Sequence, residues 1–168
     1  MEKKKLKKDF TRLIEDNQNI IFKVSRMYCN NAVCREDLFQ EILLQLWKSF
    51  PAYDKNRKYT TWMYRIALNT AISQFRKSKS IIDFTDSYPE TVPYQDNFDE
   101  KNEEAKLLFI AISKLNKAEK AIIMLYMDDC RYEEISEIMG ISVSNVGVKI
   151  NRIKKKLKEY LKDLGYGL

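Results

Sequence analysis

Positive charge gathers in one stretch near the C-terminal end of the sequence. Between residues 149 and 162 there are seven basic side chains and one acid, Glu159. If this stretch is a helix, its like charges repel one another unless an anion is their usual neighbour. The chemistry that these residues indicate is therefore the binding of phosphates, as on nucleic acid.

A helix-turn-helix pattern surrounds the start of this basic stretch. Residues 132–139 have helical spacing, Gly140 is typical of a helix C-terminus, and Ser142 can cap a following helix. In such motifs the second helix enters the DNA major groove by its N-terminal end. An ordinary helical hairpin with a solvated basic face would show the same spacing. The buried face of the second helix is predicted at Val146, Ile150, Ile153, Leu157 and Leu161. The candidate DNA-binding residues on its opposite face are Ser144, Asn145, Lys149 and Arg152.

A second candidate nucleic-acid site combines aromatic and basic side chains. The segment 75–79 (FRKSK) follows Tyr59, Trp62 and Tyr64. Aromatic rings can stack on unpaired nucleobases while lysines and arginines neutralise the strand backbone. Trp62 itself is better explained as a core residue.

Several classes of enzyme are excluded by residues that the sequence lacks. It has no histidine, which excludes Ser-His-Asp and Cys-His catalysis and histidine-ligated metals. No glycine-rich phosphate loop is present. The odd number of cysteines and the absence of a CxxC pair favour reduced, structural thiols in a cytosol; the three are Cys29, Cys34 and Cys130. We therefore expect no enzyme, metal or cofactor, and a carboxylate-only active site is the remaining enzymatic alternative.

Composition predicts an all-α globular protein. Hydrophobic residues make up 45% and charged residues 32% of the 168 residues, with a net charge of +6. Four glycines and three prolines are too few for the turns of a sandwich or barrel. No apolar run approaches the ~20 residues of a membrane span, and the N-terminus lacks the apolar stretch of a signal peptide. A cytoplasmic protein is expected.

An acidic segment divides the chain. Residues 80–100 hold six acids, no base and two prolines, without a sustained helical period. This composition predicts a flexible linker at 80–102 between two small helical domains at 7–79 and 103–162. A simple solvated loop would show the same composition.

The first domain is predicted to begin with two helices. Apolar residues between 10 and 28 recur at three, four or seven over much of their run. A clearer stripe follows, and Pro51 ends that helix because the residue before a proline avoids the α region. The second stripe consists of Phe39, Ile42, Leu43, Leu46, Trp47 and Phe50.

Three more helices are predicted from capping and spacing. One runs from an N-cap at Thr60 or Thr61 to Phe75, and another covers residues 119–127. The remaining one is indicated by the apolar residues Leu107, Leu108, Ile110, Ala111 and Leu115.

The polar face of the second helix contains one apolar side chain. Leu44 lies among Asp37, Gln40, Glu41 and Lys48. An apolar group on such a face can mark a protein-binding patch. A lone exposed leucine is also common and needs no explanation.

Two blocks of the sequence resemble RNA polymerase sigma factors of the sigma-70 family. The segment 37–41 (DLFQE) with Leu46-Trp47, followed by 59–69 (YTTWMYRIALN), is similar to their second region. The segment 115–157 resembles their fourth region. With nothing sizeable between the blocks, the chain resembles the extracytoplasmic-function group, which implies a transcription initiation factor whose chemistry the polymerase supplies.

The resemblance implies a role for each candidate face. Docking on the clamp coiled coil of the polymerase largest subunit would use Asp37, Gln40, Glu41 and Leu44. Opening of the minus-ten promoter element and capture of a flipped base would use Tyr59, Asn69, Arg76 and Lys77. Reading of the minus-thirty-five element would use Ser144, Asn145, Lys149 and Arg152. The implied partners are core RNA polymerase and promoter DNA, with an anti-sigma factor as a further candidate, and the acidic linker would thread towards the RNA exit path.

The sequence departs from the family pattern at Gly147 and Val148, where members usually carry polar or basic groups. Gly147 weakens a helix by up to ~1 kcal/mol relative to alanine, and the exact base contacts stay open. A helix-turn-helix regulator that binds DNA without polymerase is the alternative from another class, although no leftover seam for dimerisation is visible. A third is a helical adaptor that sequesters polymerase without touching DNA, and the basic stretch 149–162 argues against it.

Overall fold

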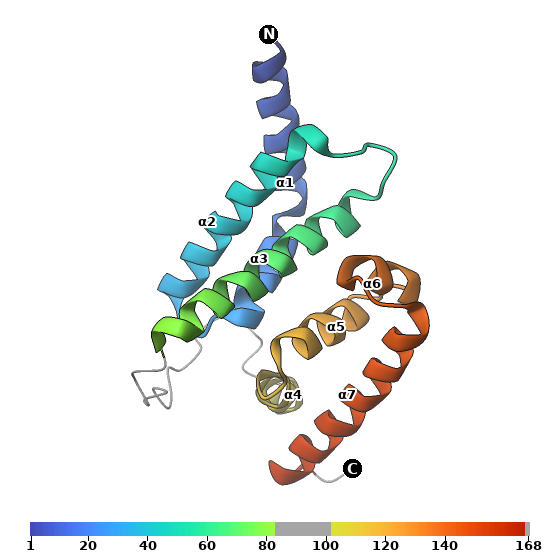
Figure 1. The fold of residues 1–168 in the computed structure, drawn as a ribbon. Helices are drawn as coiled ribbons and strands as arrows, with labels where there is room; N and C mark the ends of the chain where they lie inside the picture. The colour runs from blue at the N-terminus through green and yellow to red at the C-terminus, as the bar shows by residue number, and fades with distance from the viewer. Residues whose placement is uncertain (83–101, 167–168) are drawn as a thin grey trace. The chain divides into compact units, whose positions relative to one another are not determined.

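The computed structural model describes residues 1–82 and 102–166, all of whose regular elements are helices (Figure 1). The chain divides into two compact units, residues 1–94 and 95–168. The all-α prediction is confirmed. Most of the predicted linker, residues 83–101, lies outside the described residues. Regular structure extends to Ile82 on one side of it, and Asn102 caps the next helix on the other.

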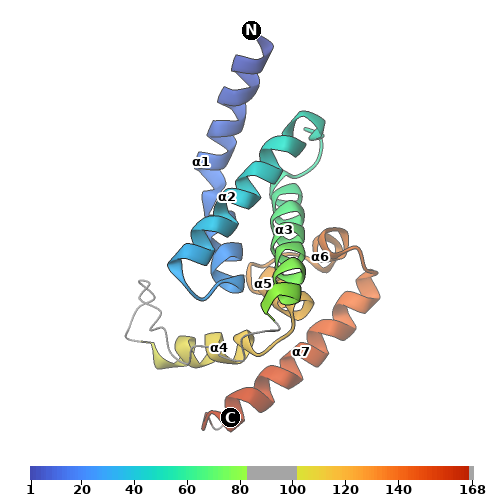
Figure 2. The ribbon, with the colours of Figure 1, turned by 60° about the vertical axis from the view of Figure 1, so that its left-hand side comes forward.

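The N-terminal unit is a bundle of three helices that all pack against one another, α1 (Glu2–Tyr28), α2 (Ala32–Ser49) and α3 (Tyr59–Ile82). A short 3-10 helix, η1 (Phe50–Ala52), follows α2 and contains the Pro51 that ends it. The predicted apolar face of α1 is confirmed as core, since Phe10, Ile14, Ile20, Ile21, Val24 and Tyr28 are buried. Figures 1 and 2 show that the first turns of α1 project past the other two helices.

The core of the bundle differs from the predicted stripes at α2 and α3. Leu38 is buried and was missed, whereas Trp47, predicted as core, keeps 37% of its surface exposed. Its indole packs edge-on against the Phe10 ring, 5.0 Å between centroids. The predicted cap of α3 was wrong. The helix begins at Tyr59, and the Trp62 amide already donates to the Lys58 carbonyl.

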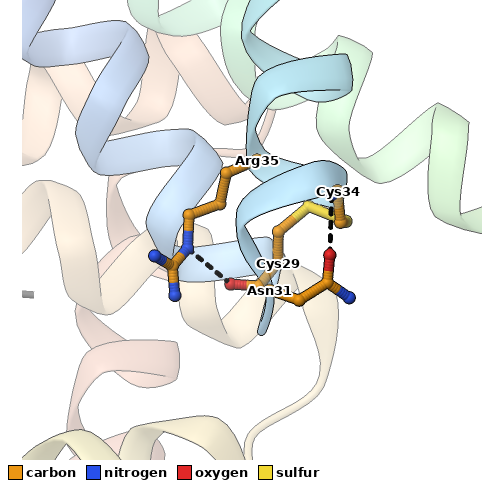
Figure 3. The surroundings of a disulfide bond; sticks show 4 residues. All are labelled: Cys29, Asn31, Cys34 and Arg35. Atoms are coloured by element: carbon orange, nitrogen blue, oxygen red, sulfur yellow. Dashed lines mark hydrogen bonds between the residues drawn. A yellow bond between two sulfur atoms is a disulfide. The ribbon is translucent and has the colours of Figure 1, made fainter. Parts of the chain in front are cut away.

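The junction between α1 and α2 contains a disulfide between Cys29 and Cys34 (Figure 3). The prediction of reduced thiols is therefore wrong for these two cysteines, while Cys130 takes no part in a disulfide. The spacing of the two cysteines in the sequence did not predict this bond, because the tight turn between α1 and α2 brings them together. Asn31 caps α2 by accepting the Cys34 amide at 2.8 Å, and Arg35 donates through Nε to the Cys29 carbonyl.

The C-terminal unit comprises α4 (Glu103–Ser113), α5 (Lys117–Met127), α6 (Tyr132–Met139) and α7 (Val143–Asp163). Helix α7 packs against the other three. Ile110, predicted as core, is exposed, and its buried place is taken by Ile112 together with Ala111. Helix α5 starts with a reciprocal capping box between Asn116 and Glu119.

The turn of the predicted helix-turn-helix is confirmed residue by residue. Helix α6 ends at Gly140, whose φ of 68° is the left-handed conformation that glycine adopts without steric cost. Ser142 then caps α7 by accepting the Asn145 amide at 3.1 Å. Both signals act within a few residues, which is why the sequence displays them.

Candidate nucleic-acid and protein interfaces

The first candidate interface is the outer face of α7. Val146, Ile150, Ile153 and Leu157 are buried, as predicted. Of the predicted DNA-binding residues, Ser144, Asn145 and Arg152 are exposed and Lys149 is half-buried at the edge of the face. The structure therefore brings all four onto the accessible part of one helix, next to its capped N-terminus, where backbone amides favour anions.

Gly147 and Val148, the two departures from the family pattern, have different surroundings. Val148 keeps 46% of its surface exposed, one turn from both Ser144 and Arg152, so the centre of the face is apolar. At Gly147 an added Cβ would lie 3.5 Å from Cε2 of the Tyr132 ring, an ordinary contact. Gly147 therefore lies beside α6, and the apolar centre suits a methyl group at a base edge.

Two lysines of the basic stretch of α7 form hydrogen bonds with side chains of the same domain. Lys156 pairs with Glu119, and Lys154 donates to the Tyr126 hydroxyl at 2.8 Å while lying over its ring. The hydrogen bond that Lys156 donates to Glu119 and the one that Lys154 donates to Tyr126 raise the pKa of each lysine, so both stay charged. The sequence gave no sign of these partners, because they lie on α5, about 30 to 40 residues earlier. Lys155 and Lys158 are exposed and remain suited to phosphates.

The second candidate interface is the exposed side of α3. Tyr59 lies at the start of the helix and Asn69 in its middle, and both are exposed. Arg76 and Lys77 belong to the same helix. Before α3, the loop is held by the Tyr53 hydroxyl, which donates to the Arg57 carbonyl, and by the Asn56 amide, which donates to Asp54.

Two of the aromatic residues proposed for stacking lie elsewhere. Tyr64 is buried, with 6% of its surface exposed, so the suggestion that its ring stacks on nucleobases is wrong. Trp62 is half-buried beside Tyr53 and Phe50, with centroids 4.7 and 6.2 Å away, in keeping with its assignment as a core residue. Tyr59 alone of the three presents an accessible ring at the surface of α3.

The third candidate interface is the outer face of α2. Asp37 and Gln40 are exposed, and Leu44 keeps 44% of its surface accessible on the same face. Glu41 is half-buried and accepts a hydrogen bond from Gln45 at 2.9 Å, so part of its capacity is used within the helix. Sequence reasoning missed two further apolar members, Val33 and Trp47, both exposed. Helical spacing could have predicted them, because Val33 lies four residues before Asp37 and Trp47 lies three residues after Leu44.

The described residues, 1–82 and 102–166, contain no group of three or more His, Cys, Asp or Glu side chains that could hold a metal ion. None of the helices in these ranges is long and apolar enough to cross a membrane.

Comparison with known proteins covers both units. The family model described as Sigma-70 region 2 matches residues 13–81, and the model described as Sigma-70, region 4 matches residues 110–157. The chain is 27% identical to the ECF RNA polymerase sigma factor SigW of Bacillus subtilis, over 92% of this chain and 90% of that protein. It is 26% identical to the ECF RNA polymerase sigma-E factor of Haemophilus influenzae, over 94% and 90%. In fold it is similar to the sigma factor RpoE of Bartonella quintana, solved in complex with the anti-sigma factor NepR. That likeness has a TM-score of 0.78 and 20% identity, and covers 92% of this chain and 98% of that one.

Proposed function

This chain belongs to the extracytoplasmic-function group of the sigma-70 family, and we propose that its three exposed helix faces divide promoter recognition among them. It is a polymerase-associated factor that gives the enzyme its promoter specificity. The finer assignment is that α2 binds core polymerase, α3 opens the minus-ten element and α7 reads the minus-thirty-five element.

The face of α2 is assigned to core polymerase. Its exposed polar residues, which include Asp37 and Gln40, lie on the same face as the accessible Leu44, a mixture of charge and apolar surface that suits a protein partner better than DNA. Negative charge here would repel phosphates, so nucleic acid is a poor occupant of this face.

The face of α3 is assigned to strand opening. Tyr59 offers an accessible aromatic ring on which a base that has left the stack can lie, and Asn69 offers an accessible amide further along the same helix. Arg76 and Lys77 continue the same helix with positive charge.

The face of α7 is assigned to duplex reading. Arg152 is able to make a bidentate contact to guanine, while Ser144 and Asn145 offer short polar groups next to the helix N-terminus. Lys149 lies at the edge of this face, where it can reach a phosphate.

No catalytic role is proposed for the chain itself, because the polymerase with which it acts carries out the chemistry. Its place is then the cytoplasm, where core polymerase and promoter DNA are found. The RpoE structure contains an anti-sigma factor, and a protein of that kind is a candidate regulator of this chain.

One observation carries the proposal against a regulator that binds DNA alone. The chain that carries the helix-turn-helix also carries the accessible acidic and apolar face of α2, in a domain matched by the region 2 model. A simple DNA-binding regulator has no use for that domain, and that alternative is not favoured.

The test is a pull-down with core polymerase followed by transcription from a pool of genomic fragments. The purified chain should bind core polymerase and make it start at a small set of fragments that share two sequence elements. Binding to DNA without polymerase, and no promoter-specific transcripts, would contradict the proposed function.

A further inference from the structure

An aromatic cluster gathers three distant parts of the N-terminal unit at one end of the bundle. Phe10 of α1 packs against Trp47 at 5.0 Å and against Phe50 at 5.2 Å. Phe50 in turn lies 6.3 Å from Tyr53, which is the start of the loop before α3. Helix α1 at Phe10, the end of α2 and the loop before α3 therefore meet at this end.

The side chains around this cluster are mostly positive. Residues 2–9, 48 and 54–58 contain nine lysines and arginines and three acids. We call these segments the basic end. Five of the nine lie on the first turns of α1, and all five are exposed: Lys3, Lys4, Lys5, Lys7 and Lys8. None of these five side chains forms an ion pair among the described residues.

The helical conformation makes this arrangement unfavourable without a partner. A helix brings Lys3 beside Lys7 and Lys4 beside Lys8, and like charges at this spacing destabilise it. The positive end of the helix dipole adds to the repulsion, and Glu2 is the one acid of the first turn that opposes it. These first turns of α1, residues 2–9, which we call the tip, also project past the other two helices (Figures 1 and 2), and all five of their lysines are exposed.

The chemistry of the tip favours a phosphate backbone over a lipid surface. Leu6 is the one apolar side chain between Glu2 and Asp9, so the helix has no apolar face to enter a bilayer. The five lysines cover a broad side of the projecting helix, away from Leu6, and suit a polyanion that passes alongside it.

We propose that the basic end binds the phosphate backbone of promoter DNA, in addition to the contacts made by α3 and α7. The loop before α3 leads directly into Tyr59, so DNA engaged there passes the basic end. The inference rests on the proposed function, because it requires that α3 engages promoter DNA. Its contribution is sequence-independent affinity, since lysine contacts to phosphates carry no base information.

The test compares two double variants with equal loss of charge. Lys4→Gln/Lys8→Gln removes two tip lysines, and Lys23→Gln/Lys106→Gln removes two exposed lysines away from the basic end, one in each unit. Each variant is assembled with core polymerase, and its affinity for promoter duplex is measured from 50 to 200 mM salt. The tip variant should bind all promoters more weakly by the same factor. The negative slope of log K against log salt should become shallower by about 1.8, because two phosphate contacts are lost. The control should keep the parent slope.

Further measurements keep the result interpretable. Circular dichroism should show equal or greater helix content in the tip variant, because the repulsive pair is removed. A photo-crosslinker in place of Glu2 should label promoter DNA. Labelling of a polymerase subunit, loss of core binding by the tip variant, or equal slopes in both variants would overturn the proposal. Failure of the proposed function is seen separately, as parent holoenzyme that starts at no specific promoter.

Discussion

The two units hold their binding helices by different means. In the C-terminal unit, Gly140 and Ser142 lie within five residues of Ser144 and Asn145, where the α7 face begins, and each acts on the adjacent backbone. In the N-terminal unit, the faces of α2 and α3 depend on contacts between helices, including the rings around Phe50 and the disulfide that joins the end of α1 to α2. The difference shows that a binding helix is positioned either by its own termini or by its neighbours.

The largest expected effect tests whether the outer face of α2 contributes to polymerase binding and not to folding. Asp37→Arg should abolish binding to core polymerase, because a reversed charge inside a matched interface costs several kcal/mol. Asp37 is exposed, so circular dichroism and thermal unfolding should not change. Binding is measured by size-exclusion chromatography with core polymerase.

The matched control is Glu15→Arg, which makes the same change of charge at an exposed position of α1. It should bind core polymerase like the parent. Equal loss of binding in both variants would mean that net charge, rather than the face of α2, controls docking.

A smaller effect tests whether the N-terminal unit depends on its covalent link. Cys34→Ser should lower the free energy of unfolding of that unit by about 2 kcal/mol, because the short loop is no longer closed in the unfolded chain. Both tryptophans of the sequence, Trp47 and Trp62, lie in this unit, so indole fluorescence in a urea titration follows it alone.

The same titration with a reducing agent supplies the control. Reduction should shift the parent to the midpoint of Cys34→Ser and leave the variant where it was. A parent insensitive to reductant would contradict the assigned disulfide.

The smallest effect tests whether local signals hold the C-terminal unit. Gly140→Ala should destabilise α6 and α7 by about 1 kcal/mol, since alanine is strained at the left-handed φ of 68°. Gly147→Ala should stabilise α7 by up to ~1 kcal/mol, since its Cβ meets the Tyr132 ring at an ordinary distance. Hydrogen exchange of peptides from α6 and α7 measures both changes in stability. If both substitutions stabilised these helices, or both destabilised them, the different roles assigned to Gly140 and Gly147 would be refuted.

The same contrast explains how far the sequence could predict the molecule. The bounds of α6, the left-handed Gly140, the Ser142 cap and the buried face of α7 were all readable, because each depends on a few neighbouring residues. The burial of Tyr64 and the exposure of Trp47 were not, because they depend on where α1 and α2 cross α3. The pairing of Lys156 with Glu119 depends in the same way on how α5 packs against α7, whereas the pairing of Cys29 with Cys34 depends on the turn between α1 and α2.

Strand opening tests most directly the claim that α3 and α7 have separate roles. Holoenzymes with Asn69→Ala and with Arg152→Ala are compared on one promoter, at concentrations that saturate the duplex in gel-shift titrations, by permanganate reactivity of the promoter thymines. Asn69→Ala should leave duplex binding nearly intact and the thymines unreactive. Arg152→Ala should weaken duplex binding by about 1–3 kcal/mol, so that a higher concentration of holoenzyme is required to saturate the promoter. Once the promoter is saturated, this variant should open the DNA normally. Normal opening by Asn69→Ala together with no opening by saturated Arg152→Ala would contradict the division of roles.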